Sequence, residues 1–297
     1  MDANNCFSQR EGSWIEYIDL SIAIENNLPS DPPFMIPQVI YTDHKEGAKE
    51  MSAIFSGMDA AMHLPDGKGW AVESAILSTH NGTHLDAPYH YAPVMDRSAK
   101  EKKAWTIEQI PLDWCIGHLV VLDFSEMPDG YVAVPSDIDK KLACLNYQLK
   151  IGDIVCVHTS AAGYWGKPEY LSKGCGIGKE ATLHILKQGI KVVGTDAWSW
   201  DAPFSHTGKK WKESLEKGEP DSSIIWEGHF AGIEMGYCHL EKLTNLDKVP
   251  PLGSTIYCFP IKIKDASAGW VRAVASNVRL GSCIDESSRH GRPFFKR

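Results

Sequence analysis

The chain has 297 residues, of which 43% are hydrophobic and 23% are charged, an ordinary composition for a globular protein with a large core. The formal net charge of −8 provides no basic surface of the kind that binds nucleic acid or an anionic membrane. Eight scattered cysteines without a C-x-x-C pair, no apolar leader and no run of transmembrane length predict a cytoplasmic protein with free thiols.

The first seventy residues contain little periodic pattern. Residues 1–16 are predicted as a polar N-terminal arm, and an apolar stretch over 15–24 predicts a first strand. Residues 27–70 are rich in Pro, Asp, Gly and Met, and they predict a long irregular segment. Such a segment either covers a pocket of its own chain or reaches a partner, and its apolar side chains either line that pocket or pack on the body.

A histidine-rich stretch follows, from His80 to His90. His80, Gly82, His84 and Asp86 are spaced two apart, so an extended strand would direct them all to one face. The absence of a side chain at Gly82 would leave space between the two imidazoles. A proline at position 88 ends the strand, which places His90 just beyond it.

Two imidazoles and a carboxylate on one face predict a metal site. This ligand set is common for zinc, manganese and iron. The alternative is a polar strand whose histidines are only hydrogen-bonded. The combination of His80, His84 and Asp86 favours the metal, because three potential ligands on one face are a more specific pattern than one histidine.

The rest of the chain alternates between strands and helices, which predicts an α/β fold. Apolar strands are expected at 118–124, 153–158, 190–194, 254–263 and 271–278, and helices at 135–142 and 178–189. A hydrophilic stretch over 205–222 predicts a surface insert. Residues 17–285 are predicted as a single domain, followed by a polar tail at 286–297. Walker A, G-x-G-x-x-G and G-x-S-x-G motifs are absent.

The motif His-x-Gly-Thr-His-x-Asp-x-Pro-x-His at 80–90 resembles the signature of the cyclase family, whose members include bacterial kynurenine formamidases and isatin hydrolases. Three further segments resemble that family: Asp19-Leu20-Ser21, the stretch 193–201 with its two aspartates, and the run Glu241 to Asp247. The likeness extends from about residue 17 to residue 280. One departure is Leu28-Pro29-Ser30-Asp31, which stands where the formamidases carry a Trp-Pro-Gly-Asp segment whose tryptophan contacts substrate.

The resemblance implies a metal centre and a fold. It implies that His80, His84 and Asp86 hold a first divalent ion, most often Zn²⁺ with Mn²⁺ as an alternative. Asp86 would bridge to a second ion held by His229 and Glu241, so that one or two ions bind per chain. The implied fold is a swivelling β/β/α type with a mixed central sheet, usually assembled as a homodimer or higher homo-oligomer.

The resemblance also implies an activity, in which His90 is the general acid/base. A metal ion lowers the pKa of bound water to about 7, and a neutral histidine can carry the proton to a leaving group. The predicted function is metal-dependent hydrolysis of an amide C–N bond, in an N-formyl aryl amine or a cyclic amide. A lactonase that opens a cyclic ester is one alternative, and a non-catalytic metal or small-molecule binding protein is another. Five aromatic residues suit a flat or cyclic substrate, although core packing explains them equally: Trp70, Tyr89, Trp198, Trp200 and Trp226.

Overall fold

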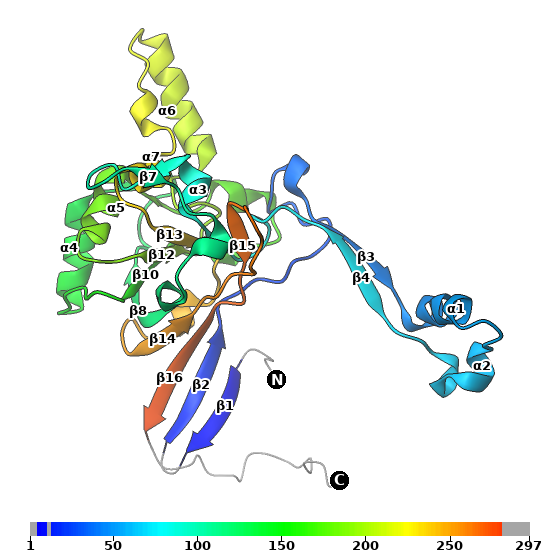
Figure 1. Ribbon diagram of the computed structural model, residues 1–297. Helices are drawn as coiled ribbons and strands as arrows, with labels where there is room; N and C mark the ends of the chain where they lie inside the picture. The colour runs from blue at the N-terminus through cyan, green and yellow to red at the C-terminus, as the bar shows by residue number, and fades with distance from the viewer. Residues whose placement is uncertain (1–4, 11–12, 281–297) are drawn as a thin grey trace.

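The computed structural model describes residues 5–10 and 13–280, and its centre is a curled mixed sheet of ten strands (Figure 1). Four neighbouring strands run parallel, namely β8 (Ile116–Asp123), β10 (Ile154–His158), β12 (Val192–Thr195) and β13 (Cys238–Glu241). Beyond β8 the sheet continues antiparallel through β14 (Ser254–Tyr257), β16 (Val274–Leu280), β2 (Ser13–Asp19) and β1 (Asn5–Arg10). Beyond β13 it continues through β5 (His84–Asp86) and β15 (Ala268–Trp270). This mixed sheet confirms the predicted α/β fold class.

Alternate residues of the parallel strands point into two separate apolar cores. Val120, Val155 and Val193 face helices α4 (Pro135–Cys144) and α5 (Lys179–Leu186). Leu119 and Ile154 face the opposite side, where the sheet curls over and its own outer strands complete the core. Continuous apolar runs are expected of parallel strands buried on both faces. Burial on both faces therefore holds the parallel strands in place, and these strands carry part of the candidate site described below.

The remaining elements lie outside the ten-stranded sheet. The helices are α1 (His44–Ile54), α2 (Ala60–His63), α3 (Pro88–Tyr91), α6 (Phe204–Glu216) and α7 (Glu227–Glu234). Three two-stranded ladders pair β3 (Gln38–Thr42) with β4 (Val72–Ile76), β6 (Val94–Met95) with β7 (Lys102–Lys103), and β9 (Val132–Ala133) with β11 (Gly176–Ile177). In the part of the chain that the structure describes, no helix has the length and apolarity needed to cross a membrane.

Several sequence expectations need correction. The N-terminal residues are not a loose arm, because β1 and β2 pair as the outer strands of the main sheet. The first strand ends at Asp19 rather than at residue 24. Residues 27–70 are not irregular, since they contain β3, α1 and α2. The surface insert over 205–222 is mostly the helix α6, which buries no residue. The predicted tail at 286–297 lies outside the described residues.

The segment between residues 36 and 78 forms an arm that projects away from the body (Figure 1). Its stem is the antiparallel hairpin of β3 and β4, and its tip is formed by α1 and α2. Trp70 belongs to this arm, where its indole N–H donates to Glu50. The chain enters the arm after residue 31 and leaves it just before His80, so both roots of the arm adjoin the histidine-rich stretch.

Candidate metal centre

His80 lies in a tight turn rather than on a strand, contrary to the sequence prediction. Strand β5 begins only at His84. Asn81 closes the turn by accepting a hydrogen bond from the backbone of Ser78 at 2.8 Å. Gly82 has φ +61°, and a Cβ there would lie 2.8 Å from Ile24. The glycine is therefore required by backbone conformation and by Ile24, and not by space for an ion between the imidazoles.

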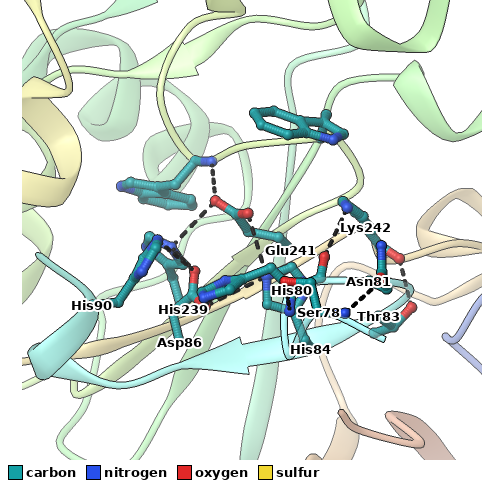
Figure 2. Close-up of polar contacts among 12 residues, drawn as sticks. Ser78, His80, Asn81, Thr83, His84, Asp86, His90, His239, Glu241 and Lys242 are labelled. Carbon is teal, nitrogen blue, oxygen red and sulfur yellow. Dashed lines mark hydrogen bonds and ion pairs between the residues drawn. The ribbon is translucent and has the colours of Figure 1, made fainter. Parts of the chain in front are cut away.

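The strand β5 sets His84 and Asp86 on one face, as predicted. It lies between β13 and β15, and its register places His84 opposite Glu241 and Asp86 opposite His239. Both side chains are completely buried. The turn brings His80 back to the same point, with its Nδ1 2.9 Å from Oδ1 of Asp86. Figure 2 shows these side chains converging from neighbouring segments.

The last turn of the motif is the short helix α3, which Pro88 opens. Proline at the first helical position is favourable, because its missing N–H would have no partner there. The helix returns His90 towards the strand, where Nε2 lies 4.0 Å from Oδ2 of Asp86. Its ring is 4.1 Å from that of His80 and 5.0 Å from that of Trp226, measured between centroids.

The C-terminal part of the chain supplies the other half of the site. His229 lies on α7, while His239 and Glu241 alternate on β13 and share a face. His239 Nε2 lies 2.8 Å from Asp86 and 3.2 Å from Glu241. His229 Nε2 lies 3.6 Å from Oε1 of Glu241. His239 is the residue that the sequence analysis missed, although its spacing of two from Glu241 repeats the spacing of His84 and Asp86.

Two sets of side chains have ligand atoms close enough to hold an ion. His80, His84 and Asp86 form the first set. Asp86, His229, His239 and Glu241 form the second, and within each set the ligand atoms lie within 4.8 Å of one another. Asp86 belongs to both sets, the position expected of a bridging ligand. The structure thus brings together all five sequence-predicted ligands, His80, His84, Asp86, His229 and Glu241, and adds His239.

The unpartnered atoms at the centre fit a divalent cation. In the described part of the chain, His84 Nε2 and Asp86 Oδ1 are buried and form no hydrogen bond; His80 Nδ1 lies 2.9 Å from Asp86 Oδ1 but is not aligned to donate to it. Buried polar groups are normally hydrogen-bonded, because desolvation without a partner costs about 1–3 kcal/mol. The lone pair of an imidazole and a carboxylate oxygen are both good donors to zinc or manganese. The chemistry of the donor set therefore matches a metal ion.

Outer contacts orient the imidazoles for that role. His84 Nδ1 lies 2.9 Å from the carbonyl of Gly82, which can only accept, so Nδ1 carries the proton and Nε2 keeps its lone pair. Asp201 does the same for His229, since it contacts Nδ1 and also accepts the backbone N–H of residues 228 and 229. The carboxylate of Glu241 accepts a hydrogen bond from the backbone N–H of Trp200 at 2.9 Å. Such partners typically fix the ring orientation of metal-binding histidines.

Burial and the neighbouring side chains shift the pKa values of three groups at the centre, namely His90, Asp86 and His239. Burial, reinforced by the imidazoles of His80 and His229, lowers the pKa of His90 to about 3 against the opposing carboxylate of Asp86. His90 is then neutral at pH 7 and able to accept a proton. Burial opposes ionisation of Asp86, but His90, His80 and His84 hold its pKa well below the ordinary value. Although burial acts in the other direction, hydrogen bonds to Asp86 and Glu241 raise the pKa of His239 to about 9.

The fold and the site define a class of protein: a mixed α/β protein with a buried two-part His/Asp/Glu centre and a neutral histidine beside it. A sequence model of the family described as "Putative cyclase" matches residues 18–202, and the chain belongs to that family. This confirms the resemblance found in the sequence.

Named relatives agree with the assignment. The chain is 28% identical over 219 residues to a kynurenine formamidase of Erythrobacter litoralis, covering 73% of this chain and 82% of the relative. It is 23% identical over 219 residues to an isatin hydrolase of Roseibium aggregatum, covering 71% and 76%. A crystal structure of an isatin hydrolase bound to the product analogue thioisatinate superposes with a TM-score of 0.65 at 20% identity, over 88% of this chain and 92% of that one. The predicted cyclase-like fold is therefore confirmed.

Proposed function

We propose that this protein is a metal-dependent hydrolase that cleaves the C–N bond of an amide, either an N-formyl aryl amine or a cyclic amide. The observation that carries the proposal is the pair of unpartnered buried atoms, His84 Nε2 and Asp86 Oδ1, beside the neutral imidazole of His90. The names of the relatives support the choice of an amide, because one relative is a kynurenine formamidase and a formamidase hydrolyses a formamide.

The proposed ligands are His80, His84 and Asp86 for one ion and Asp86, His229, His239 and Glu241 for another. Zinc is the preferred metal, because its usual ligands are imidazole nitrogen and carboxylate oxygen, and manganese is the alternative. A divalent ion bound there would polarise the substrate carbonyl and lower the pKa of water. Two donor sets that share Asp86 support two ions per chain.

His90 is the proposed general acid/base. Its imidazole is neutral and lies at the open side of the centre, with 22% of the side chain exposed. In the hydrolysis, water adds its oxygen to the carbonyl carbon and transfers a proton to His90. The C–N bond then breaks as His90 returns that proton to the leaving nitrogen, so His90 is unchanged over the cycle.

An aromatic wall beside His90 supports a flat or cyclic substrate. Trp226 stacks on His229, with centroids 4.2 Å apart and planes 17° apart, and it also contacts the rings of His90 and Phe230 edge to face. Trp200, by contrast, is wholly buried and Trp70 belongs to the arm, so neither supports the substrate argument. Trp226 is therefore the aromatic residue best placed to face a substrate ring.

We further propose that the chain forms a homodimer in the cytoplasm. The arm supports self-association, because a two-stranded hairpin is marginally stable alone and this one exposes apolar side chains. In the described part of the chain, six free cysteines support a reducing compartment: Cys115, Cys144, Cys156, Cys175, Cys238 and Cys258.

The experiment that tests the proposed function is hydrolysis of N-formylkynurenine and of isatin by the purified protein, loaded separately with zinc and with manganese. We expect turnover of at least one of the two amides, and its loss when a chelator removes the metal. An unsaturated lactone of similar size serves as the comparison substrate. Turnover of the lactone alone would show that the protein is a lactonase and not an amidase. Metal binding without turnover of any of the three substrates would indicate a binding protein.

A further inference from the structure

A buried lysine and aspartate lie directly beside the candidate metal centre. Lys242 follows Glu241 in the chain and is 1% exposed, which is rare for lysine unless it is paired. Its ammonium forms an ion pair with Asp31, which is also buried and lies 211 residues earlier in the sequence. The same ammonium donates to the carbonyl of His80 at 2.8 Å, a contact that Figure 2 shows at the edge of the site.

Asp31 connects this pair to the turn that carries His80. Its second carboxylate oxygen accepts a hydrogen bond from Asn81 at 3.0 Å, while its first accepts the indole N–H of Trp198 at 2.9 Å. Asn81 is the residue that closes the turn through Ser78. The Lys242–Asp31 pair therefore contacts the turn at two points, the carbonyl of His80 and the side chain of Asn81. Asn81 also donates to the carbonyl of Met35 at 2.6 Å, and the His80 ring lies 3.1 Å from the hydroxyl of Ser267, so the pair provides two of several attachments.

The backbone of Lys242 is arranged to make this contact possible. Its φ is +58°, a left-handed conformation that costs free energy for a residue other than glycine. Two hydrogen bonds keep it there, from Lys242 N–H to the carbonyl of Ala197 at 3.0 Å and from the hydroxyl of Thr83 to the carbonyl of Lys242 at 2.6 Å. The turn in the backbone lets Glu241 contact His84 and His239 while Lys242 reaches His80.

A lysine suits this position because an ammonium is a donor only. It has three N–H groups, of which Asp31 and the His80 carbonyl use two, and the ring of Trp198 lies 5.4 Å from the nitrogen. An apolar side chain would fill the space but leave the His80 carbonyl without this donor.

We propose that Lys242 and Asp31 are positioning residues that hold the His80 turn, and with it the His80 imidazole, in place for the metal. This inference rests on the proposed function, in that His80 is taken as a metal ligand.

The test is metal affinity in the double variant Asp31→Asn/Lys242→Met, which removes both charges and so leaves no lone buried ion. The matched control is Asp129→Asn/Lys173→Met, because Asp129 and Lys173 form an ion pair at 2.7 Å that touches none of the candidate ligands. Zinc affinity is measured by competition with a chromogenic chelator, and ligand geometry by the visible absorption spectrum of the cobalt-loaded protein. His80→Ala serves as the reference for loss of that ligand.

We expect the double variant to bind the zinc at the His80, His84 and Asp86 set about 10- to 100-fold less tightly than the wild type does, the usual effect of removing an outer partner of a ligand. Its cobalt spectrum should shift towards that of His80→Ala, while the control stays within about twofold of the wild type, since nothing near its ligands changes. Unchanged affinity and spectrum in the folded double variant would overturn the positioning proposal alone. A wild type that takes up no zinc or cobalt would instead overturn the proposed function.

Circular dichroism shows whether each variant is folded. Should the double variant not fold, Asp31→Asn alone decides the question by the same two measurements, because it keeps the shape of the side chain and removes its charge. A lower zinc affinity and a shifted cobalt spectrum in that variant would support the proposal, and wild-type values of both would contradict it.

Discussion

At the scale of single residues, the chemistry of the centre depends on which imidazoles keep a lone pair. The carbonyl of Gly82 fixes the proton of His84 on Nδ1, and Asp201 contacts Nδ1 of His229. Among the described residues His90 has no such carboxylate at hydrogen-bonding distance, since Asp86 is 4.0 Å away. His84 and His229 are thus arranged to bind a cation, whereas His90 is free to exchange a proton.

Replacement of His90 separates catalysis from metal binding. We expect His90→Ala to keep the metal content of the wild type, because His90 belongs to neither ligand set. Its kcat should fall by about 10² to 10⁴, the usual contribution of a general acid/base. Steady-state kinetics together with metal analysis by mass spectrometry provide the measurement. Wild-type kcat in this variant would remove His90 from the mechanism.

Replacement of His239 tests the residue that sequence reasoning missed. His239 belongs only to the set with His229 and Glu241, so His239→Gln should weaken one ion and spare the other. The expected result is a fall in bound zinc from about two ions to about one per chain after dialysis, since a site that loses a ligand loses affinity. Two ions retained at wild-type affinity would show that His239 only donates a hydrogen bond to Asp86.

At the scale of elements, the start of α4 shows how a side chain fixes a helix on the sheet. Pro135 occupies the first turn, and Asp137 accepts hydrogen bonds from Tyr131 at 2.7 Å and from the backbone of Val134 at 3.1 Å. The sequence analysis expected a helix over 135–142, and the structure extends it to Cys144. Ile138 and Leu142 then pack against the parallel strands that lead to the site.

The pKa of Asp137 predicts how this helix start responds to pH. Burial opposes ionisation, but the bonds from Tyr131 and Val134 hold the pKa below its ordinary value. A group with a lowered folded-state pKa stabilises the protein above its unfolded pKa, about 4, and loses that contribution as pH falls through the folded value. Asp137→Ala should therefore cost about 1 kcal/mol at pH 7 and less at pH 3.

Urea unfolding of wild type and variant at the two pH values provides the measurement. Asp139→Ala is a matched control on the same helix, because Asp139 is exposed and its ion-pair partner in the described part of the chain is the side chain of His184. A difference in stability between wild type and Asp137→Ala that is equal at pH 7 and pH 3 would contradict the assignment.

At the scale of the whole molecule, local patterns could be predicted from the sequence and long-range contacts could not. His84, Asp86 and His90 lie within seven residues, so their spacing alone predicted that their side chains lie close together. His239 stands two residues from Glu241, as His84 does from Asp86, but its contact with Asp86 and the pair of Asp31 with Lys242 join segments 153 and 211 residues apart, and no spacing reveals such contacts. His229 and Glu241 were found only through the family resemblance. The arm was predicted as irregular because its stem alternates weakly and its tip buries few side chains.

The arm carries the prediction for assembly. Ile40, Val72 and Ile76 share one face of the β3–β4 hairpin and are 62%, 47% and 67% exposed. We expect Ile40→Ser/Ile76→Ser to convert a dimer into a monomer, because a second copy would cover this face. Light scattering after size-exclusion chromatography measures the mass, with Ile151→Ser on the body as the control for loss of an exposed isoleucine. A dimer of unchanged stability in the double variant would exclude this face as the interface.

The central claim is that the His/Asp/Glu centre holds the metal on which hydrolysis depends. The most direct measurement is a titration of metal-free protein with zinc or manganese while amide hydrolysis and bound metal are followed together. We predict no hydrolysis without metal, recovery in proportion to occupancy, and no recovery in His84→Ala, which loses the buried Nε2 at the centre of the site. Full hydrolysis by the metal-free protein, or full recovery in His84→Ala, would contradict the account.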